Sequence, residues 1–225
     1  MNRNAGKNDP PKTLSPQEAG EIIRLANIIY FRTKVWDNSY WMGLKLAKCP
    51  MDLWIYQELI VNNQPDVLIE TGTYTGGSAL FFAQIMDLVG HGKVITVDIE
   101  KYNTFPKHPR IEYLTGSSTD PSIIGLIKNR IAGSSKTMVI LDSDHHTEHK
   151  LKEMEVYGSL MYPGDYMIVE DSCFDEYPAW PEFGPGPAAA IREYFSRHAD
   201  FEIDKSMEKH LISFAPKGFL RKTKP

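Results

Sequence analysis

Acidic residues follow four apolar segments of the chain, and these side chains are the best suited to catalysis or ligand binding. The segments end at Glu70, at Asp98, at Asp142 and at the pair Glu170–Asp171. In a parallel sheet, ligands bind beyond the carboxyl ends of the strands. A single acid at such a position can simply cap a helix, but five acids together are harder to explain in that way. We therefore expect these carboxylates to lie at one edge of a sheet and to form one site.

Three of these acids predict a metal site. Asp142, Glu170 and Asp171 converge if their strands are neighbours, and three carboxylates held close repel one another unless a cation or protons neutralise them. Oxygen ligands suit Mg²⁺ or another divalent cation, which keeps waters that a substrate hydroxyl can displace. Such a metal would orient the hydroxyl and lower its pKa. The alternative is that one acid caps a helix and another forms a surface ion pair.

Histidines cluster directly after the first of these acids, in Asp142-Ser-Asp-His145-His146-Thr-Glu-His149. A histidine beside a metal can take a proton from a hydroxyl, so we predict catalytic roles for His145 and Asp142. The alternatives for His145 are support of a neighbouring group or a structural role. A zinc site is disfavoured because H-x-x-x-H here lacks the glutamate of H-E-x-x-H. We interpret His146 and His149 as helix-surface residues or caps.

A glycine-rich loop, Glu70-Thr-Gly-Thr-Tyr-Thr-Gly-Gly-Ser78, joins one of the strands to a helix. Such a turn brings backbone close to a ligand and offers free N–H groups. The spacing is neither G-x-G-x-x-G nor that of a P-loop. Glu70 would repel a pyrophosphate but attract the ammonium group of an amino acid. Asp98, one strand–helix–strand unit later, can bind ribose hydroxyls or merely cap the next loop. Together they predict a ligand with nucleoside and amino-acid parts.

Strands and helices alternate along the chain and must position these residues. The strands are apolar on both faces, which indicates an α/β fold with a mostly parallel sheet covered on both sides. We expect an antiparallel pair of strands at the end of this sheet. The expected strands are 66–70, 92–98, 111–114, 137–142, 166–171, 201–204 and 210–214. A helical extension is expected over 16–62, after a loose arm over 1–15, with the main domain over 63–225.

The loop resembles the cofactor loop of class I S-adenosylmethionine-dependent methyltransferases, particularly of the catechol O-methyltransferase type. Gly116-Ser-Ser-Thr-Asp120 is similar to their adenine-side turn. The chain is more similar still to the cephalosporin hydroxylase-like family, over about residues 36–175. The motifs that carry this resemblance are Trp41-x-Gly43, Lys48-x-Pro50-x-Asp52, Leu141-Asp142-Ser-Asp-His145 and Pro163-Gly164-Asp165-Tyr166-x-Ile-Val-Glu170-Asp171.

The resemblance implies a Rossmann-like methyltransferase fold and S-adenosylmethionine as cofactor. It implies metal ligation by Asp142, Glu170 and Asp171, and it places His145 where the catechol-type enzymes have their basic residue. The reaction it implies is metal-assisted O-methylation of a small hydroxylated acceptor, of the sugar, natural-product or phenolic type. The implied cofactor-binding residues are Glu70, Gly72, Tyr74, Gly76, Gly77, Ser78, Asp98, Ser118, Thr119 and Asp142.

Three other functions remain open at this point. An N-methyltransferase would need no metal to deprotonate its acceptor. A partner protein could keep the fold and bind S-adenosylmethionine without catalysis. A nicotinamide-dependent oxidoreductase is disfavoured because the pyrophosphate-binding fingerprint is missing.

The composition argues against several kinds of partner. A net charge of −4 and an isoelectric point near 6.0 argue against binding to nucleic acid or to an anionic membrane. No apolar run approaches the roughly 20 residues that span a bilayer. The two cysteines, Cys49 and Cys173, lack metal-ligand spacing, so a cytoplasmic protein is expected. Aromatic residues around Trp36 and in 174–187 are expected either to pack as core or interface, or to form a lid and an apolar wall over the substrate. The N-terminal extension is also a candidate homo-oligomer interface.

Overall fold

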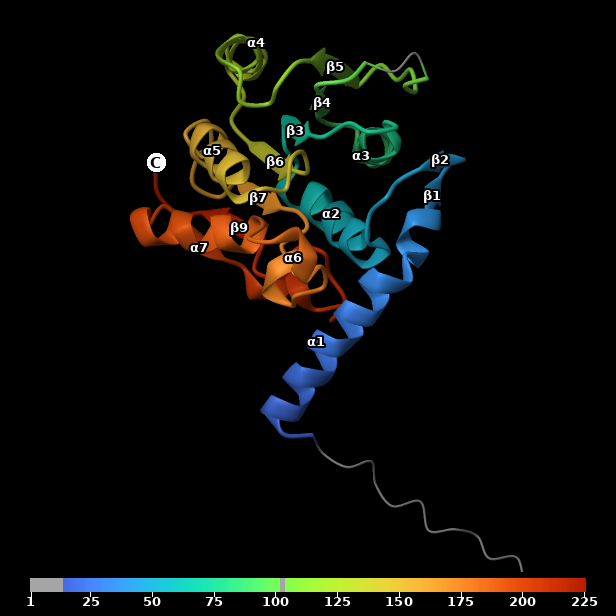
Figure 1. Ribbon diagram of the computed structural model, residues 1–225. Coiled ribbons are helices and arrows are strands. Elements are labelled where there is room, and N and C mark those ends of the chain that lie inside the picture. The colour runs from blue at the N-terminus through green and yellow to red at the C-terminus, as the bar shows by residue number, and fades with distance from the viewer. Residues whose placement is uncertain (1–13, 102–103) are drawn as a thin grey trace, which may run out of the picture.

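The computed structural model describes residues 14–101 and 104–225, and its centre is one sheet (Figure 1). Seven strands lie in the order β5-β4-β3-β6-β7-β9-β8. The strands from β5 to β7 are parallel, and β9 is antiparallel to both of its neighbours. The α/β class and the mostly parallel seven-stranded sheet are therefore confirmed. The strands are β3 (Val67–Thr71), β4 (Lys93–Asp98), β5 (Ile111–Thr115), β6 (Thr137–Leu141), β7 (Tyr166–Val169), β8 (Phe201–Ile203) and β9 (Phe219–Lys222).

Helices cover both faces of the sheet. Two of them pack on one face, and three pack on the other (Figure 1). The first face carries α2 (Pro50–Asn63) and α3 (Gly77–Val89); the second carries α4 (Pro121–Ile131), α5 (Thr147–Gly158) and α7 (Pro187–Arg197). The short helix α6 (Cys173–Glu176) follows β7 and packs against α7.

Alternate side chains of the central strands enter the two cores. In β6, Ile140 packs on the side of α2 and Leu141 on the side of α5. In β7, Ile168 packs on the side of α2 and Val169 on the side of α5. Because both faces are buried, apolar runs rather than alternating patterns mark these strands in the sequence.

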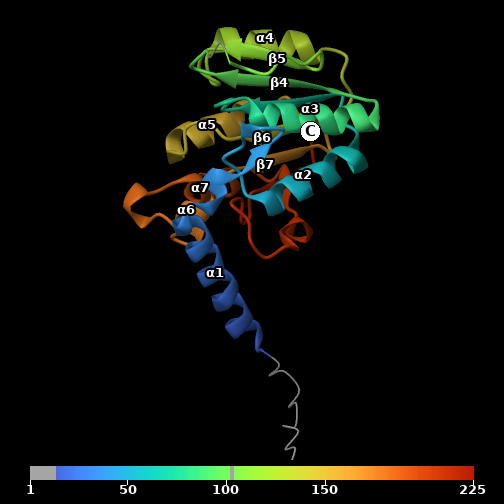
Figure 2. The same ribbon diagram turned by 90° about the vertical axis from the view of Figure 1, so that its right-hand side faces the viewer.

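Helix α1 (Pro16–Thr33) projects from the body of the protein (Figures 1 and 2). It begins as the sequence predicts, since Ser15 and Glu18 form a capping box and Pro16 follows the cap. Asn27 is its one buried residue, and its amide donates to the carbonyl of Leu211 at 2.8 Å.

A short hairpin, β1 (Tyr40–Trp41) and β2 (Leu44–Lys45), connects α1 to α2. Helix α2 contributes Tyr56 and Leu59 to the main core, although the sequence suggests it as part of a separate extension. The domain boundary at residue 62 stays a prediction. Most of the arm expected over 1–15 lies outside the described residues.

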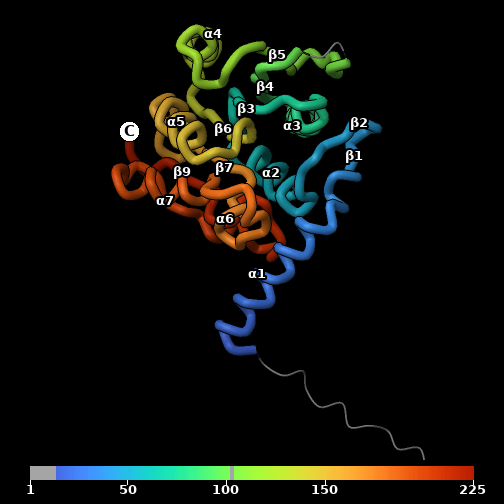
Figure 3. Tube along the Cα trace, viewed as in Figure 1, coloured from blue at the N-terminus to red at the C-terminus, as the bar shows by residue number. Residues whose placement is uncertain are grey.

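The prediction of a final strand over 210–214 is wrong, because β9 lies further on, at Phe219–Lys222. The backbone of the earlier segment bonds to helix side chains instead of to a strand. The Ser213 N–H donates to Oδ1 of Asn27 at 2.9 Å, and the Phe214 N–H donates to Oδ2 of Asp52 at 2.7 Å. This segment, which can be followed in Figure 3, therefore joins α1 and α2 to the body.

Candidate active site

The carboxyl ends of the central strands open onto one cavity of about 1300 Å³. The loops after β3, β4, β5, β6 and β7 all contribute to its wall, as expected for a parallel sheet. From these loops the lining residues are Gly72, Tyr74, Ser78, Asp98, Ile99, Glu100, Gly116, Ser117, Ser118, Asp142, Ser143, Asp144, His145, His146 and Asp171.

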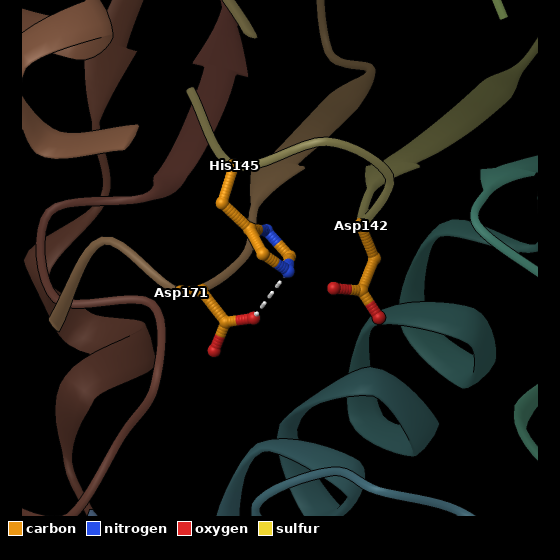
Figure 4. A group of neighbouring side chains, drawn as sticks. All are labelled: Asp142, His145 and Asp171. Atoms are coloured by element: carbon orange, nitrogen blue, oxygen red, sulfur yellow. Dashed lines mark ion pairs between the residues drawn. The ribbon is translucent and has the colours of Figure 1, made fainter. Parts of the chain in front are cut away.

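Asp142, His145 and Asp171 form a group that could hold a metal ion (Figure 4). One ligand atom from each residue lies within 4.8 Å of the others. Nε2 of His145 is 3.4 Å from Oδ2 of Asp171. Asp171, the second residue after β7, adopts a left-handed backbone conformation (φ 58°), which aspartate tolerates better than most residues. The structure thus brings together two of the three predicted metal ligands with the predicted base.

The structure does not bring Glu170 to this group. Its Oε1 accepts a hydrogen bond from Nζ of Lys48 at 2.9 Å and another from the hydroxyl of Tyr56 at 2.5 Å. Successive side chains of a strand point to opposite faces, so Glu170 turns with Ile168 towards the face that carries α2. Metal ligation by Glu170 stays a prediction that this geometry does not support.

Lys48 is a buried cation among these carboxylates. Its Nζ also donates to Oδ2 of Asp142 at 2.6 Å, and the residue is 2% exposed. Asp142 and Glu170 come directly after the paired ends of the neighbouring strands β6 and β7, and Glu70 lies on β3 opposite Ile140. The alternation of side chains along each strand places all three acids on the side of α2. Lys48 begins the motif Lys48-x-Pro50-x-Asp52, but nothing in the sequence alone indicates that it lies among these acids.

The acids outnumber the buried cation, and their pKa values reflect this. Burial raises the pKa of Asp171 well above its usual value, and Asp142 and Glu170 raise it further. Burial, with Asp142 adding to it, raises the pKa of Glu170 despite the nearby Lys48. Burial raises the pKa of Asp52 to about 8, and Glu170 adds to this effect. A site with this excess of negative charge favours a bound cation.

His145 faces this acidic group with a neutral ring. Burial lowers its pKa to about 4, and Lys150 adds to this effect, while Asp142 acts in the opposite direction. The imidazole therefore has a free lone pair near pH 7. Its ring packs edge-on against Phe174, with centroids 5.3 Å apart, which fixes its orientation.

Asp98, the predicted ribose-binding residue, lies on the cavity wall, but its carboxylate accepts hydrogen bonds from the backbone of the Gly-rich loop. Its Oδ2 accepts the backbone N–H groups of Thr73 and Tyr74, each at 2.9 Å, and its Oδ1 accepts the N–H of Glu100 at 3.0 Å. Oδ1 keeps acceptor capacity for a ligand. Ribose binding by Asp98 stays a prediction.

Glu70 is fully buried behind the loop. Its Oε2 accepts a hydrogen bond from the hydroxyl of Thr96 at 2.8 Å, and burial raises its pKa to about 7. It does not line the cavity. Its position suits electrostatic attraction of an ammonium group better than direct contact, and direct contact stays a prediction.

The glycines of the loop approach the protein's own backbone more closely than sequence reasoning suggests. A Cβ at Gly72 would lie 2.1 Å from the carbonyl oxygen of Asp142, and one at Gly77 would lie 2.3 Å from that of Lys45. A Cβ at Gly76 would meet Pro106 at 2.7 Å. Gly72 lines the cavity, whereas Gly76 and Gly77 do not. The close contacts give Gly76 and Gly77 a packing role, and cofactor binding by these two residues stays a prediction.

Gly77→Ala is expected to destabilise the protein by about 2 kcal/mol, because backbone cannot yield as easily as a side chain end. Gly125, also helical, has open space around it, so Gly125→Ala should stabilise by about 0.5–1 kcal/mol. Urea unfolding of both variants measures the difference. Equal effects would show that the contact with Lys45 is not restrictive.

The predicted adenine-side residues, Ser118 and Thr119, are buried after β5. Ser118 lines the cavity and Thr119 does not. Beside them lies a buried ion pair that the sequence analysis missed, between Lys150 and Glu153 on α5, with a distance of 3.1 Å. Glu153 also accepts the hydroxyl of Ser143 at 2.6 Å. The sequence signal for this ion pair is the spacing of Lys150 and Glu153, which places two charged residues on one otherwise apolar face of α5.

Aromatic side chains form the wall of the cavity beyond His145. Phe31 and Trp36 of the N-terminal region stack with centroids 5.6 Å apart, and Phe174 and Trp180 meet edge-on at 5.3 Å. All four residues line the cavity. The expectation that both regions form an apolar wall over the site agrees with this placement.

The described part of the chain contains no helix with the length and apolar character needed to cross a membrane.

Comparison with known proteins matches residues 33–223 to a family described as rhamnosyl O-methyltransferase/CmcI. A rhamnosyl O-methyltransferase of Mycobacterium leprae (strain TN) is 40% identical over 199 residues, which cover 85% of this chain and 86% of the relative. The corresponding protein of Mycobacterium tuberculosis H37Rv is 40% identical over 200 residues, covering 85% of this chain and 81% of that protein.

Among solved structures, the fold is similar to two structures of CmcI. The apo structure of its N160 form has a TM-score of 0.64 at 21% identity, covering 84% of this chain and 78% of that chain. The D160 form with Mg and SAM has a TM-score of 0.59 at 20% identity, covering 83% and 77%. At these identities the likeness shows a shared fold.

Proposed function

Because this chain belongs to the rhamnosyl O-methyltransferase/CmcI family, we propose that it transfers a methyl group from S-adenosylmethionine to a sugar hydroxyl. The acceptor that we propose is a rhamnosyl group, after the name of its 40% identical relatives. One observation carries the proposal. The Gly-rich loop and the Asp142–His145–Asp171 group face the same cavity, so a methyl donor and a hydroxyl acceptor can meet there.

The described residues fit the proposed cofactor. Ser78 lies in the first turn of α3, whose N-terminal residues have no side-chain cap, so free backbone N–H groups suit the amino-acid carboxylate. Glu70 lies behind this loop and supplies negative charge for the ammonium group. Asp98 and the turn at Ser118 then provide polar contacts further along the wall.

The donor set also fits a divalent cation. Asp142 and Asp171 would hold it, with His145 either as a third ligand or as the neighbouring base. Two carboxylates suit Mg²⁺, while direct ligation by the imidazole would favour a transition metal. When bound, the cation would orient the acceptor hydroxyl and lower the pKa of that hydroxyl.

The residues of the chain then perform the proton transfer. Nε2 of His145, neutral at pH 7, takes the proton of the hydroxyl while the hydroxyl oxygen attacks the methyl group. The methyl–sulfur bond breaks as the new bond to oxygen forms, and S-adenosylhomocysteine leaves. Asp171, 3.4 Å from Nε2, stabilises the positive charge that forms on the ring. The aromatic wall around Phe174 excludes water from this step.

Chelation tests the metal-assisted reaction. Activity towards a rhamnoside is expected to fall by at least a hundredfold in EDTA and to return when Mg²⁺ or Mn²⁺ is added in excess. Activity that survives chelation would favour the metal-independent alternative. No binding of S-adenosylmethionine by calorimetry would contradict any transferase function.

A homo-oligomer through the N-terminal region also stays a proposal. Helix α1 exposes Ile22, Leu25 and Ile29 at the spacing of one helical face. A second copy of the chain would cover this apolar face. A cytoplasmic location likewise stays a proposal.

A further inference from the structure

One end of the cavity lies away from Asp142 and Asp171, beyond the ends of β4 and β5. Strands β3, β4 and β5 are consecutive neighbours in the sheet, so the loops after them form a continuous wall. If the proposed cofactor has its amino-acid end at the loop after β3 and its ribose at Asp98, its base lies at the turn after β5. Ile99 lies on this wall and is 73% exposed, which suits the apolar face of a purine ring.

His149 reaches this part of the wall from the first turn of α5. The sequence suggests a helix-surface residue or a cap at this position, and in the structure His149 lines the cavity. Its Nε2 is 3.1 Å from the hydroxyl oxygen of Ser118 and 3.6 Å from Oε1 of Glu153. Among the described residues, the polar contacts of the His149 ring all use Nε2, which leaves Nδ1 for a ligand.

Glu153 determines which nitrogen of His149 carries the hydrogen. Burial by itself would raise the pKa of Glu153, but Lys150 and the neighbouring hydrogen bonds hold that pKa below its usual range. The carboxylate is therefore ionised and only accepts hydrogen bonds. A lone pair on Nε2 would face this charge and be repelled, so Nε2 carries the hydrogen and Nδ1 carries the lone pair.

We propose that Nδ1 of His149 accepts a hydrogen bond from the exocyclic amino group of adenine, and that Glu153 positions the ring for this contact. This inference rests on the proposed function, because it needs the cofactor in the cavity. A base with a carbonyl at that position would present a second acceptor to Nδ1. His149 is thus a specificity-determining residue for the nucleoside end of the cofactor, 6-amino purines being its ligand class.

The test compares S-adenosylhomocysteine with its deaminated analogue, S-inosylhomocysteine, by calorimetry on the full chain at about pH 8. The unsubstituted protein is expected to bind the adenosyl compound roughly tenfold more tightly. In His149→Phe this ratio should fall to near one, because the ring keeps its shape but loses the acceptor. His91→Phe is the matched control, since His91 is exposed and pairs with Asp66 away from the cavity; it should keep the tenfold ratio.

A second variant tests the role of Glu153 without touching the ligand. Lys150→Met/Glu153→Gln removes the fixed acceptor without leaving a buried unpaired cation, so both tautomers of His149 become accessible and the ratio should also fall. A ratio in His149→Phe equal to that of the unsubstituted protein would overturn the inference while leaving the proposed function intact. Failure of the unsubstituted protein to bind S-adenosylhomocysteine would overturn the proposed function, and this inference with it.

Discussion

Asp171→Asn is expected to lower kcat/KM for methyl transfer by about a thousandfold, equivalent to about 4 kcal/mol of transition-state stabilisation. Asp171 contributes an oxygen to the only group of possible metal ligands found among the described residues, and it is also the partner of His145. The amide keeps the shape of the side chain but removes its charge. Both the affinity for a divalent cation and the stabilisation of protonated His145 should therefore decrease.

Two measurements separate these effects. Calorimetric titration with Mn²⁺ reports the cation affinity alone, and steady-state kinetics at saturating Mn²⁺ reports the contribution to proton transfer. Asp87→Asn is a suitable control because Asp87 pairs with Arg110 at the surface; its activity should be unchanged. Unaltered Mn²⁺ affinity in Asp171→Asn would contradict the assignment of this residue as a ligand.

Glu170→Gln tests whether Glu170 is also a metal ligand. The sequence predicts Glu170 as a metal ligand, whereas the structure directs it to Lys48 and Tyr56. If Glu170 serves only these partners, its substitution should leave the Mn²⁺ affinity nearly unchanged. A loss as large as that of Asp171→Asn would show that Glu170 turns to the metal when a metal is bound.

The family and the enzyme class could be predicted from the sequence, and both are confirmed. The resemblance to a family is one basis for this prediction, and the physical pattern of the sequence is another. Apolar runs that end on acids identify buried parallel strands and their ligand-binding edge. The strand prediction over 210–214 failed because the apolar residues of this segment pack against α1 and α2. Nothing in its own sequence indicates that Asn27 and Asp52 accept its backbone hydrogen bonds.

The composition of the site was less predictable than its location. Glu170 and Asp171 are consecutive, so an extended backbone would send them to opposite faces. Which of them enters the cavity depends on the left-handed turn at Asp171, and sequence patterns do not specify that turn. The surroundings of His149 were unpredictable for a related reason, because Ser118 and Glu153 create them and only the tertiary fold brings these residues together.

Buried charges were the hardest features to predict. Lysine is among the residues least often buried, so nothing in the sequence leads one to expect Lys48 and Lys150 inside the fold. Both are buried in this fold, and each has a carboxylate partner. The pairing is a property of neighbouring strands and helices rather than of any local pattern.

Lys48→Met is expected to lower the free energy of unfolding by about 3–5 kcal/mol, because it leaves buried carboxylates without their cation. For a chain of this size, that corresponds to a fall in Tm of roughly 10 °C. Thermal and urea unfolding of the metal-free protein measure the effect. Lys45→Met is the matched control. Lys45 lies in the same connecting segment but is more exposed and forms an ion pair with Asp37, so its loss should cost less than about 1 kcal/mol.

Lys48→Met/Glu170→Gln distinguishes loss of charge balance from loss of packing. Glutamine keeps an oxygen that can accept the hydrogen bond of Tyr56 but removes the charge that Lys48 compensates. The double variant should therefore recover at least about half of the lost stability. If it is no more stable than Lys48→Met, the lysine stabilises the fold through its aliphatic chain. Recovery would mean that Lys48 is required because Glu70, Asp142 and Glu170 all lie near its ammonium group, whether or not a metal is bound beside them.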